Sequence, residues 1–376
     1  MRIAFDAKRA FHNGTGLGQY SRNLLNALIE GYPQHDYYLA TPRPGSLYMP
    51  PAQGNIHTML PGGVYKTFPS LWRSSGIRHD LRQLGIDLFH GLSHEIPVGL
   101  KGIRSVVTMH DLIYERYPSQ YKAIDVAVYR KKFKYACKHA DVVIAISRQT
   151  AEDLQQFYKV PADKIKVCYQ SCNPSFQHPV DDATMQRVRE KYKLPQQYLL
   201  TVGSIIERKN LLNIVKAVHR LGDTLHMPLA VIGKGSGSYY EQVRHYIKQH
   251  NLLQKVLFLG EHDGGADTSD MPAIYRGATA NIYASVFEGF GIPILESMWS
   301  GVPVITSNVS CMPETGGDAP LYVNPLDVEE LSAAIARVTT DDTLRSDMVQ
   351  EGLVQAQKFT PARCAGAVMQ VYESLV

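Results

Sequence analysis

Short runs of apolar residues alternate with longer amphipathic stretches along most of the chain. Such alternation is typical of parallel strands joined by helices, so it predicts an α/β fold built on Rossmann-like sheets. The strand-like runs of the first half span residues 2–6, 37–41, 86–90, 105–109, 141–146 and 165–168. A second series spans residues 198–202, 229–232, 256–259, 280–284 and 302–306.

The restart of the pattern predicts two domains, as does a length of 376 residues, which exceeds a single core of ordinary size. Residues 170–179 lie between the two series and carry Asn173-Pro174 and Pro179, turn-forming residues that indicate a linker. We therefore expect an N-terminal Rossmann-like domain over residues 1–170 and a C-terminal one over residues 171–357. Residues 358–376 are expected to form a final helix, because Thr360 suits an N-cap and Pro361 the first helical position.

Composition excludes several classes of protein. The chain is 44% hydrophobic and 20% charged, which provides enough apolar surface for folding and too little bias for disorder. No run approaches the roughly 18 apolar residues of a membrane span, and no signal peptide is visible, so a cytoplasmic location is expected. The five cysteines are odd in number and lack a CxxC pair, which argues against a disulfide framework and a structural zinc site.

The net charge of +4 is unevenly distributed. Residues 1–170 contain 22 Lys and Arg against 13 Asp and Glu, whereas residues 171–376 contain 17 against 22. A basic first half would attract an anionic acceptor or an anionic lipid surface through a long-range field. An unevenly charged but merely solvated surface is the alternative interpretation.

Residues 285–297, SVFEGFGIPILES, form the most informative segment. Glu288 and Glu296 flank a Gly289-Phe290-Gly291 turn that leads from a strand-like run into a helix. Glycines let backbone N–H groups approach a phosphate, the helix N-terminus adds partial positive charge, and carboxylates accept hydrogen bonds from sugar hydroxyls. These residues suit a nucleotide sugar, although their spacing alone also fits an ordinary strand-turn-helix with a capping Glu.

This segment, followed by Gly301-Val302-Pro303-Val304, resembles the donor-site signature of the family 4 retaining glycosyltransferases, which have the two-domain GT-B fold. The resemblance implies that Glu288 contacts the transferred sugar and that Glu296 binds the nucleoside ribose. The amides of Gly289, Phe290 and Gly291 would face the donor phosphates. It also implies a C-terminal helix that crosses back to pack on the N-terminal domain.

A second motif, Glu207-Arg208-Lys209-Asn210, follows a strand-like run and Gly203. It resembles the family element whose two cations clamp the donor diphosphate, and fixed cations would stabilise the charge that grows on a leaving nucleoside diphosphate. Arg208 can bond two phosphate oxygens at once, and Lys209 acts as a point charge. Surface salt bridges are the alternative. Gly203 is assigned to the same donor site. No Asp-x-Asp motif occupies a fitting loop, so neither a metal nor a cofactor is expected.

Two further glycine motifs follow strand-like runs. Residues 14–18, GTGLG, resemble the family's N-terminal glycine loop, which implies that Gly16 approaches the donor and Gly18 the acceptor. The motif lacks the GxGxxG spacing of a nicotinamide site, and a plain tight turn is the alternative. Gly233 opens the turn GKGSG over residues 233–237, which resembles the family's turn beside the nucleotide but equally fits a flexible connection.

His110 and Ser147 each follow a strand-like run and so face the sheet edge where ligands usually bind. By resemblance, His110 would touch the donor sugar across the cleft, although a single His-Asp pair is more often structural. Ser147 is most simply the N-cap of the next helix, while the family places a similar serine near the acceptor.

Basic residues gather on a predicted helix over residues 122–138, which also carries Ile124, Val128, Phe133 and Cys137. Such a helix could lie on anionic lipid at the inner face of the membrane and bring a lipid-linked acceptor to the site. A solvated face over an apolar core stripe is the other interpretation. The aromatic and basic stretch 65–82 is a second candidate for membrane or acceptor contact. No recognised binding module accompanies the charge, so nucleic-acid binding is not expected.

The resemblance covers nearly the whole chain. It implies a metal-independent retaining glycosyltransferase that moves a sugar from a nucleoside-diphosphate sugar to a saccharide or lipid-linked acceptor, with Glu288, His110, Arg208 and Lys209 as catalytic residues. Residues 206–210 look most like those of mannosyltransferases that use GDP-mannose in bacterial polysaccharide assembly. Two alternatives stay open: a UDP-sugar 2-epimerase with the GT-B fold, and a non-catalytic sugar-nucleotide or membrane-binding scaffold.

Overall fold

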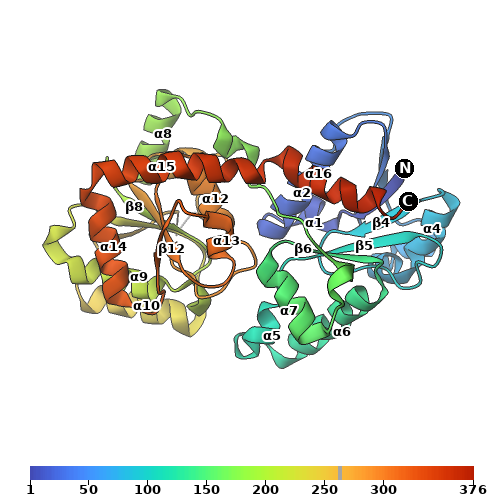
Figure 1. Ribbon diagram of the computed structural model, residues 1–376, viewed down its shortest axis with the longest axis horizontal. Coiled ribbons are helices and arrows are strands. Elements are labelled where there is room, and N and C mark those ends of the chain that lie inside the picture. The colour runs from blue at the N-terminus through green and yellow to red at the C-terminus, as the bar shows by residue number, and fades with distance from the viewer. Residues whose placement is uncertain (261–264) are drawn as a thin grey trace. The chain divides into compact units, whose positions relative to one another are not determined.

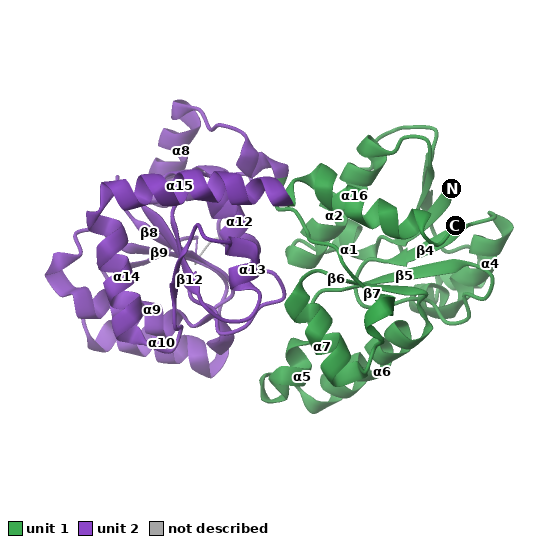
Figure 2. Cartoon of the chain, in the orientation of Figure 1, with its two compact units in different colours: residues 1–173, 359–376 green, residues 174–358 purple. Residues whose placement is uncertain are grey.

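A computed structural model describes residues 1–260 and 265–376, and the chain divides into two compact units (Figure 1). The first unit contains residues Met1–Asn173 and Phe359–Val376, and the second contains Pro174–Lys358 (Figure 2). Each unit is built on one parallel sheet, as the alternating pattern predicts. The first division follows Asn173, three residues beyond the expected boundary, and the adjoining Ser171 and Cys172 are buried.

The sheet of the first unit has seven parallel strands in the order β3-β2-β1-β4-β5-β6-β7. The edge strand β3 was not expected from the sequence, because only its Met59 is buried and the segment lacks an apolar run. The strands are β1 (Arg2–Asp6), β2 (Asp36–Ala40), β3 (Ile56–Met59), β4 (Leu88–Gly91), β5 (Arg104–Met109), β6 (Val142–Ala145) and β7 (Ile165–Val167).

Helices connect these strands because apolar side chains recur on one face of each longer segment. In α2 this face consists of Tyr20, Leu24, Leu25 and Leu28, all buried. The helices of the first unit are α1 (Lys8–His12), α2 (Gly16–Gly31), α3 (Pro69–Leu71), the π-helical turn η2 (Trp72–Gly76), α4 (Ile77–Gln83), α5 (Ile113–Arg116), α6 (Ala123–His139), α7 (Arg148–Tyr158) and α16 (Pro361–Glu373).

The sheet of the second unit has six parallel strands in the order β10-β9-β8-β11-β12-β13. From β8 the chain builds outward through β9 and β10, and from β11 it builds outward in the other direction, so the strand order reverses between β8 and β11. The strands are β8 (Leu199–Val202), β9 (Leu229–Ile232), β10 (Val256–Phe258), β11 (Ala280–Tyr283), β12 (Val304–Ser307) and β13 (Leu321–Val323).

A continuous apolar core joins this sheet to its helices, with Leu199, Val231, Ile282 and Ile305 from the strands and Val215 from α9 all buried. The helices of the second unit are α8 (Asp182–Tyr192), the 3-10 turn η6 (Glu207–Lys209), α9 (Leu211–Leu221), α10 (Gly237–Gln249), α11 (Met271–Arg276), α12 (Ile292–Trp299), α13 (Met312–Gly316), α14 (Val328–Thr340) and α15 (Asp342–Ala356).

The final helix, α16, belongs to the first unit and packs on α2 (Figure 1). It begins as its sequence suggests, since the Thr360 hydroxyl accepts a hydrogen bond from the backbone N–H of Arg363. Its buried face includes Ala365, Val368 and Tyr372. The helix therefore completes the apolar core of a unit whose other residues are 1–173.

Helix α6 departs from the expected apolar stripe. Phe133 and Cys137 are buried as predicted, but Ile124 is 72% exposed and Val128 is 45% exposed. Val126 and Ala136 are buried in addition, because the buried face of this helix is rotated away from the face that the sequence suggested.

All five cysteines are free and buried. Among residues 1–260 and 265–376, no helix combines the length and apolar character that crossing a membrane requires.

Candidate functional site

The loops that follow β8 and β11 lie next to each other, because these two strands are neighbours in the parallel sheet. Ligands in open α/β sheets bind where the strand order reverses, beyond the carboxyl ends of the strands. The loop after β8 carries Arg208 and Lys209, and the loop after β11 carries Glu288. The topology thus brings together three of the residues that the sequence singled out.

The carboxylate of Glu288 forms ion pairs with both cations. Its Oε1 lies 2.8 Å from Nη1 of Arg208 and 2.6 Å from Nζ of Lys209. Arg208 and Glu288 are only 8% and 7% exposed. Burial alone would raise the pKa of Glu288, but the charges of Lys209 and Arg208 outweigh it and lower that pKa below its ordinary value. Glu288 is therefore a carboxylate at neutral pH, and the cluster keeps one net positive charge.

Backbone contacts hold the cationic turn against the β11 loop. Nη1 of Arg208 donates to the carbonyl oxygen of Phe287 over 2.6 Å, and the Val286 N–H donates to the carbonyl oxygen of Arg208 over 2.9 Å. Asn210 has a left-handed backbone with φ of 60°, and its amide nitrogen donates to the carbonyl oxygens of Ala284 and Pro325. Asn210 thus fixes the direction of the backbone after Arg208 and Lys209.

Lys209 is positioned by an aromatic ring as well as by Glu288. Its ammonium donates to the Tyr283 hydroxyl over 2.8 Å and lies 4.9 Å from the ring centroid. The predicted Gly203 has φ of +151° and approaches the Lys209 side chain, and a Cβ on Gly233 would lie 1.8 Å from the Gly203 carbonyl oxygen. Close packing therefore requires a glycine at position 233, and the positive φ favours one at position 203, so both have a structural reason that is independent of any ligand.

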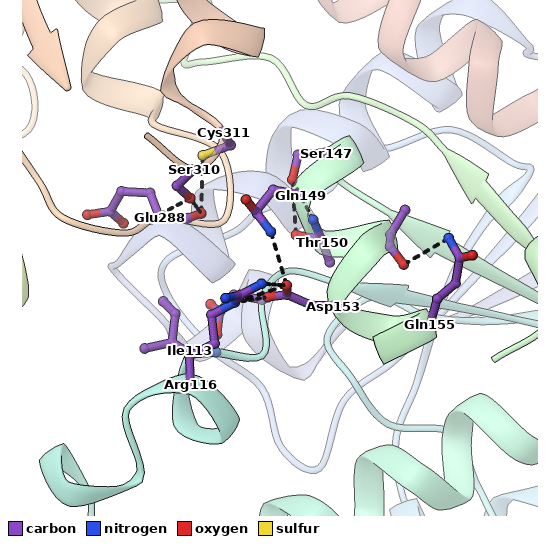
Figure 3. A network of polar contacts seen from close by, with 12 residues as sticks. Ile113, Arg116, Ser147, Gln149, Thr150, Asp153, Gln155, Glu288, Ser310 and Cys311 are labelled. Atoms are coloured by element: carbon purple, nitrogen blue, oxygen red, sulfur yellow. Dashed lines mark hydrogen bonds and ion pairs between the residues drawn. The ribbon is translucent and has the colours of Figure 1, made fainter. Parts of the chain in front are cut away.

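The segment after Glu288 is anchored through its backbone (Figure 3). Oγ of Ser310 donates to the carbonyl oxygen of Glu288 over 2.8 Å, and Sγ of Cys311 contacts the same oxygen at 3.2 Å. Gly289, Phe290 and Gly291 are buried, and the Phe290 carbonyl accepts from the Thr315 hydroxyl. These contacts fix the turn from which α12 starts.

Glu296 lies in α12, on the helix that this turn begins. Its Oε2 accepts a hydrogen bond of 2.7 Å from the hydroxyl of Tyr275 in α11. Burial raises the pKa of Glu296 to about 7, against a smaller opposing effect of this hydrogen bond. The two carboxyl groups thus differ, because the pKa of Glu296 is raised and that of Glu288 is lowered.

His110 directly follows β5 in the first unit and is buried. Its Nε2 hydrogen-bonds the carbonyl oxygen of Leu92 over 2.9 Å, and its backbone N–H donates to Nε2 of His94 over 3.0 Å. Burial, with a smaller effect of His94, lowers the pKa of His110 to about 3, so the imidazole is neutral. The Tyr20 ring meets it edge-on with centroids 4.6 Å apart. The predicted sugar contact of His110 stays a prediction.

The glycine motif near the N-terminus is not a loop before a helix, as expected, but the first turn of α2, which starts at Gly16. Thr15 is the N-cap of this helix and has an extended backbone, so Gly14 and Thr15 precede the helix while Gly16 and Gly18 lie in it. A Cβ on Gly18 would lie 1.8 Å from the carbonyl oxygen of Asn13, whereas the space around Gly16 is open. Close packing therefore explains why position 18 is a glycine, but it does not explain the glycine at position 16.

Ser147 is the N-cap of α7, the simpler of the two interpretations of its sequence position. Its hydroxyl accepts from the Thr150 N–H over 3.0 Å and is fully buried (Figure 3). A role in acceptor binding stays a prediction, since the contacts of Ser147 are accounted for by capping.

Several residues around the site had no role assigned to them from the sequence. Tyr275, Tyr283 and Asn210 support the predicted site residues through contacts that join distant parts of the chain. Only Asn210 had a usable signal, because asparagine tolerates the left-handed backbone at a turn. Within the described part of the chain, no group of three or more His, Cys, Asp or Glu side chains is arranged to hold a metal ion.

Two family models match the chain, one in each half. The model described as Glycosyltransferase Family 4 matches residues 14–176, and the model described as Glycosyl transferases group 1 matches residues 184–354. The chain belongs to the family 4 glycosyltransferases. Both domains of the family are thus present in the expected order, and the GT-B architecture predicted from the sequence is confirmed.

Relatives of this glycosyltransferase include two mannosyltransferases. The O-antigen chain mannosyltransferase B of Escherichia coli is 29% identical over 77% of this chain and 74% of its own length. The O-antigen chain mannosyltransferase RfbU of Salmonella typhimurium is 28% identical over 65% of this chain and 63% of its own length, so the match spans less than two thirds of that protein. The structure of Anabaena HepE in complex with UDP-glucose has the same fold, with a TM-score of 0.75 at 16% identity over the full length of both chains.

Proposed function

We propose that this glycosyltransferase transfers mannose from GDP-mannose to a saccharide or lipid-linked acceptor during polysaccharide synthesis, with retention of the anomeric configuration and without a metal ion. Mannose is supported by the two mannosyltransferase relatives, and a nucleotide-sugar donor by the fold shared with a protein solved with UDP-glucose. The retaining stereochemistry and the absence of a metal rest on the sequence motifs.

The observation that carries the proposal is the pairing of Glu288 with Arg208 and Lys209 beyond the carboxyl edge of β8 and β11. A buried carboxylate with two cations is costly to assemble unless the charges have a use or are well paired. A donor that presents its diphosphate to the cations and its sugar hydroxyls to the carboxylate would satisfy every group in the cluster.

Each residue of the site has a defined role in the proposed reaction. The bond between the sugar C1 and the diphosphate breaks, and Arg208 and Lys209 stabilise the charge that moves onto the leaving phosphate oxygen. The acceptor oxygen bonds to C1 on the face from which the phosphate departs, and its proton passes to that phosphate oxygen. Glu288 orients the sugar and balances the positive charge that develops on it, while Glu296 holds the ribose hydroxyls.

The experiment is an assay of nucleotide release with GDP-mannose, GDP-glucose, UDP-glucose and UDP-N-acetylglucosamine, each with and without an α-mannosyl acceptor. We expect GDP release that depends on both GDP-mannose and acceptor, persists in EDTA, and gives an α-linked product by NMR. A β-linked product would contradict retention, and loss of activity in EDTA would contradict metal independence. No release from any donor would contradict the transferase activity itself.

The same assay separates the epimerase alternative. Free UDP and a changed sugar from UDP-N-acetylglucosamine alone, without acceptor, would identify a 2-epimerase. A non-catalytic scaffold would release no nucleotide, and its thermal stability would respond to nucleotide equally in the wild type and in Glu288→Gln.

The proposal also includes peripheral contact with anionic lipid through α6. The exposed apolar side chains of Ile124 and Val128 lie on a helix that carries Arg130, Lys131 and Lys134. Basic residues beside exposed apolar groups suit the surface of an anionic bilayer. Co-sedimentation with phosphatidylglycerol vesicles should exceed that with phosphatidylcholine vesicles and should fall in Ile124→Ser. Equal binding to both vesicles would contradict this part of the proposal.

A further inference from the structure

His94 has a left-handed backbone, with φ of 65°, in the connection between β4 and β5. Lys159 and Lys193 have the same conformation at the C-caps of α7 and α8, a usual place for it, whereas His94 follows a strand. Such strain persists only where surrounding contacts fix it. The backbone N–H of His94 donates to the Thr108 carbonyl oxygen over 2.9 Å, and its ring stacks on Phe133 with centroids 4.4 Å apart. These contacts hold the buried imidazole in one orientation.

The imidazole of His94 contacts the next residue beyond β5, which is His110. Nε2 of His94 accepts a hydrogen bond of 3.0 Å from the backbone N–H of His110, and the two rings meet edge-on with centroids 5.1 Å apart. A backbone N–H can only donate, so Nε2 of His94 is unprotonated. Burial lowers the pKa of His94 to about 3, so its ring is neutral and carries its proton on Nδ1.

Neighbouring segments also fix the carbonyl group and the ring of His110. Its carbonyl oxygen accepts a hydrogen bond of 3.2 Å from the Thr150 hydroxyl, whose oxygen accepts one of 3.1 Å from the Ser147 hydroxyl (Figure 3). Nε2 of His110 lies 2.9 Å from the carbonyl oxygen of Leu92. Because a carbonyl oxygen can only accept, Nε2 of His110 carries a proton.

Nδ1 of His110 is the polar atom that these contacts leave over. Burial lowers the pKa of His110 to about 3, so the ring holds a single proton, and this proton is the one that Nε2 donates to Leu92. Nδ1 is therefore a hydrogen-bond acceptor. In the part of the chain that the structure describes, no donor contacts it. His110 is only 5% exposed, and an acceptor without a partner is unfavourable in so buried a side chain.

We propose that His94 is a positioning residue for the transfer reaction, which fixes His110 so that Nδ1 accepts a hydrogen bond from a hydroxyl of the donor sugar. This inference rests on the proposed function, in which His110 contacts that sugar. A neutral ring whose N–H is bonded to Leu92 cannot donate to a phosphate oxygen. A hydroxyl group, in contrast, can supply the proton that Nδ1 lacks.

The first experiment locates the protons without turnover. The protein is labelled with 15N-histidine, and long-range 1H–15N spectra of the wild type and His110→Gln are compared to identify the His110 signals among those of the 14 histidines. We expect a protonated Nε2 and an unprotonated Nδ1, unchanged between about pH 6 and about pH 8. An unprotonated Nε2, or a ring that titrates in this range, would overturn the proposal.

The second experiment tests whether His94 acts through His110. His94→Phe keeps a ring against Phe133 but removes the acceptor, whereas His94→Gln keeps an acceptor at a similar reach. We expect His94→Phe to lower kcat/KM for the donor about tenfold and His94→Gln to restore most of it. In a His110→Phe background, His94→Phe should lower kcat/KM no further.

A purely structural role of His94 would give a different result, an equal loss of kcat/KM in both backgrounds, and this would refute the positioning role. His219→Phe is the matched control, because it removes a histidine that hydrogen-bonds Tyr246 over 2.9 Å in the second unit. It should leave kcat/KM unchanged. The melting temperature of each variant shows whether it is folded at the assay temperature.

The third experiment tests the direction of the hydrogen bond to the sugar. Deoxyfluoro forms of GDP-mannose replace one hydroxyl at a time with fluorine, which can accept but cannot donate. We expect the wild type to bind one of them about tenfold or more weakly than GDP-mannose, and His110→Phe to bind the same two ligands equally. A difference that survives in His110→Phe, or no difference at any position, would refute the acceptor role of Nδ1.

Failure of the proposed function has a separate signature, the absence of both binding and turnover with every nucleotide sugar. The histidine spectra need no ligand. They therefore decide the protonation state of His110 even if the protein proves not to be a transferase.

Discussion

The hydroxyl of Tyr372 hydrogen-bonds Nδ1 of His90, joining α16 to β4 across 282 residues of sequence. Both side chains are fully buried. Nε2 of His90 forms a hydrogen bond of 2.8 Å with Oγ1 of Thr108, and Oγ1 of Thr108 forms one of 3.0 Å with the hydroxyl of Tyr20. Since the Tyr20 ring packs on His110, the final helix is linked through four polar side chains to a predicted catalytic residue.

Removing the Tyr372 hydroxyl should therefore destabilise the first unit. Tyr372→Phe keeps the ring but leaves Nδ1 of His90 buried without its partner, which costs about 1–3 kcal/mol. Urea unfolding followed by circular dichroism measures the loss. Ser374→Ala, which removes an exposed hydroxyl from the same helix end, is the control. An equal effect of both substitutions would show that the His90 contact contributes nothing.

Loss of the Arg208 side chain should reduce turnover in protein that is still folded. Arg208→Ala removes a preorganised cation at the leaving group, for which about 2.7–4 kcal/mol of transition-state stabilisation, or 10²–10³ in kcat, is the expected loss. Steady-state kinetics with GDP-mannose measures it. Arg220→Ala, at an exposed arginine of α9 that pairs with Glu329, should leave kcat unchanged. Wild-type turnover in Arg208→Ala would contradict the predicted clamp.

Glu288→Gln should separate catalysis from nucleotide binding. The amide keeps the shape of the side chain but removes the charge that faces the developing positive charge on the sugar, so kcat should fall at least about tenfold. The Arg208 and Lys209 cations lose their counter-charge and should bind GDP at least as tightly as before. Calorimetric titration with GDP checks this, and a parallel loss of GDP affinity and turnover would indicate a folding role for Glu288.

The raised pKa of Glu296, about 7, predicts a specific pH dependence of stability. Between about pH 4.5 and pH 7 the folded chain keeps a proton that the unfolded chain has released. The free energy of unfolding therefore falls as pH rises from about 4.5 to about 7. Glu296→Gln cannot titrate and should gain about 1–3 kcal/mol over the wild type between about pH 5 and pH 8. Parallel unfolding curves at both pH values measure the difference. A constant difference would show that Glu296 titrates normally.

Gly16 and Gly18 provide a matched pair within one helical turn. Gly18→Ala places a methyl group against the Asn13 carbonyl and should destabilise the protein by about 1–3 kcal/mol. Gly16→Ala meets open space and should fold normally. If Gly16 approaches the donor as predicted, Gly16→Ala raises the KM for GDP-mannose without changing the melting temperature. An unchanged KM would remove Gly16 from the donor site.

The strands that the sequence predicted are those with buried apolar runs, such as β1 and β9, whose bounds match the expected residues. The edge strands β3 and β13 escaped prediction because their residues are mostly exposed or half-buried and do not form such a run. The other two edge strands, β7 and β10, were predicted, so prediction from the sequence depends on a recognisable apolar run and not on the position of the strand in the sheet.

The neighbourhood of Glu288, Arg208 and Lys209 was predictable because each follows a parallel strand at the same sheet edge. The sharing of one carboxylate oxygen by both cations was not, since 79 or more residues separate the partners in sequence. The same holds for Asp6 and Arg73. Their ion pair depends on η2, a π-helical turn that the sequence did not predict.

Helix α16 has a consequence for how the molecule is made. On the ribosome, residues 359–376 emerge after every residue of the second unit, yet Ala365, Val368 and Tyr372 fill the core of the first. Domains usually fold in their order of synthesis. Here the residues of α2 that α16 covers stay exposed until α16 has been synthesised, so the core of the first unit cannot be completed before the second unit has been made.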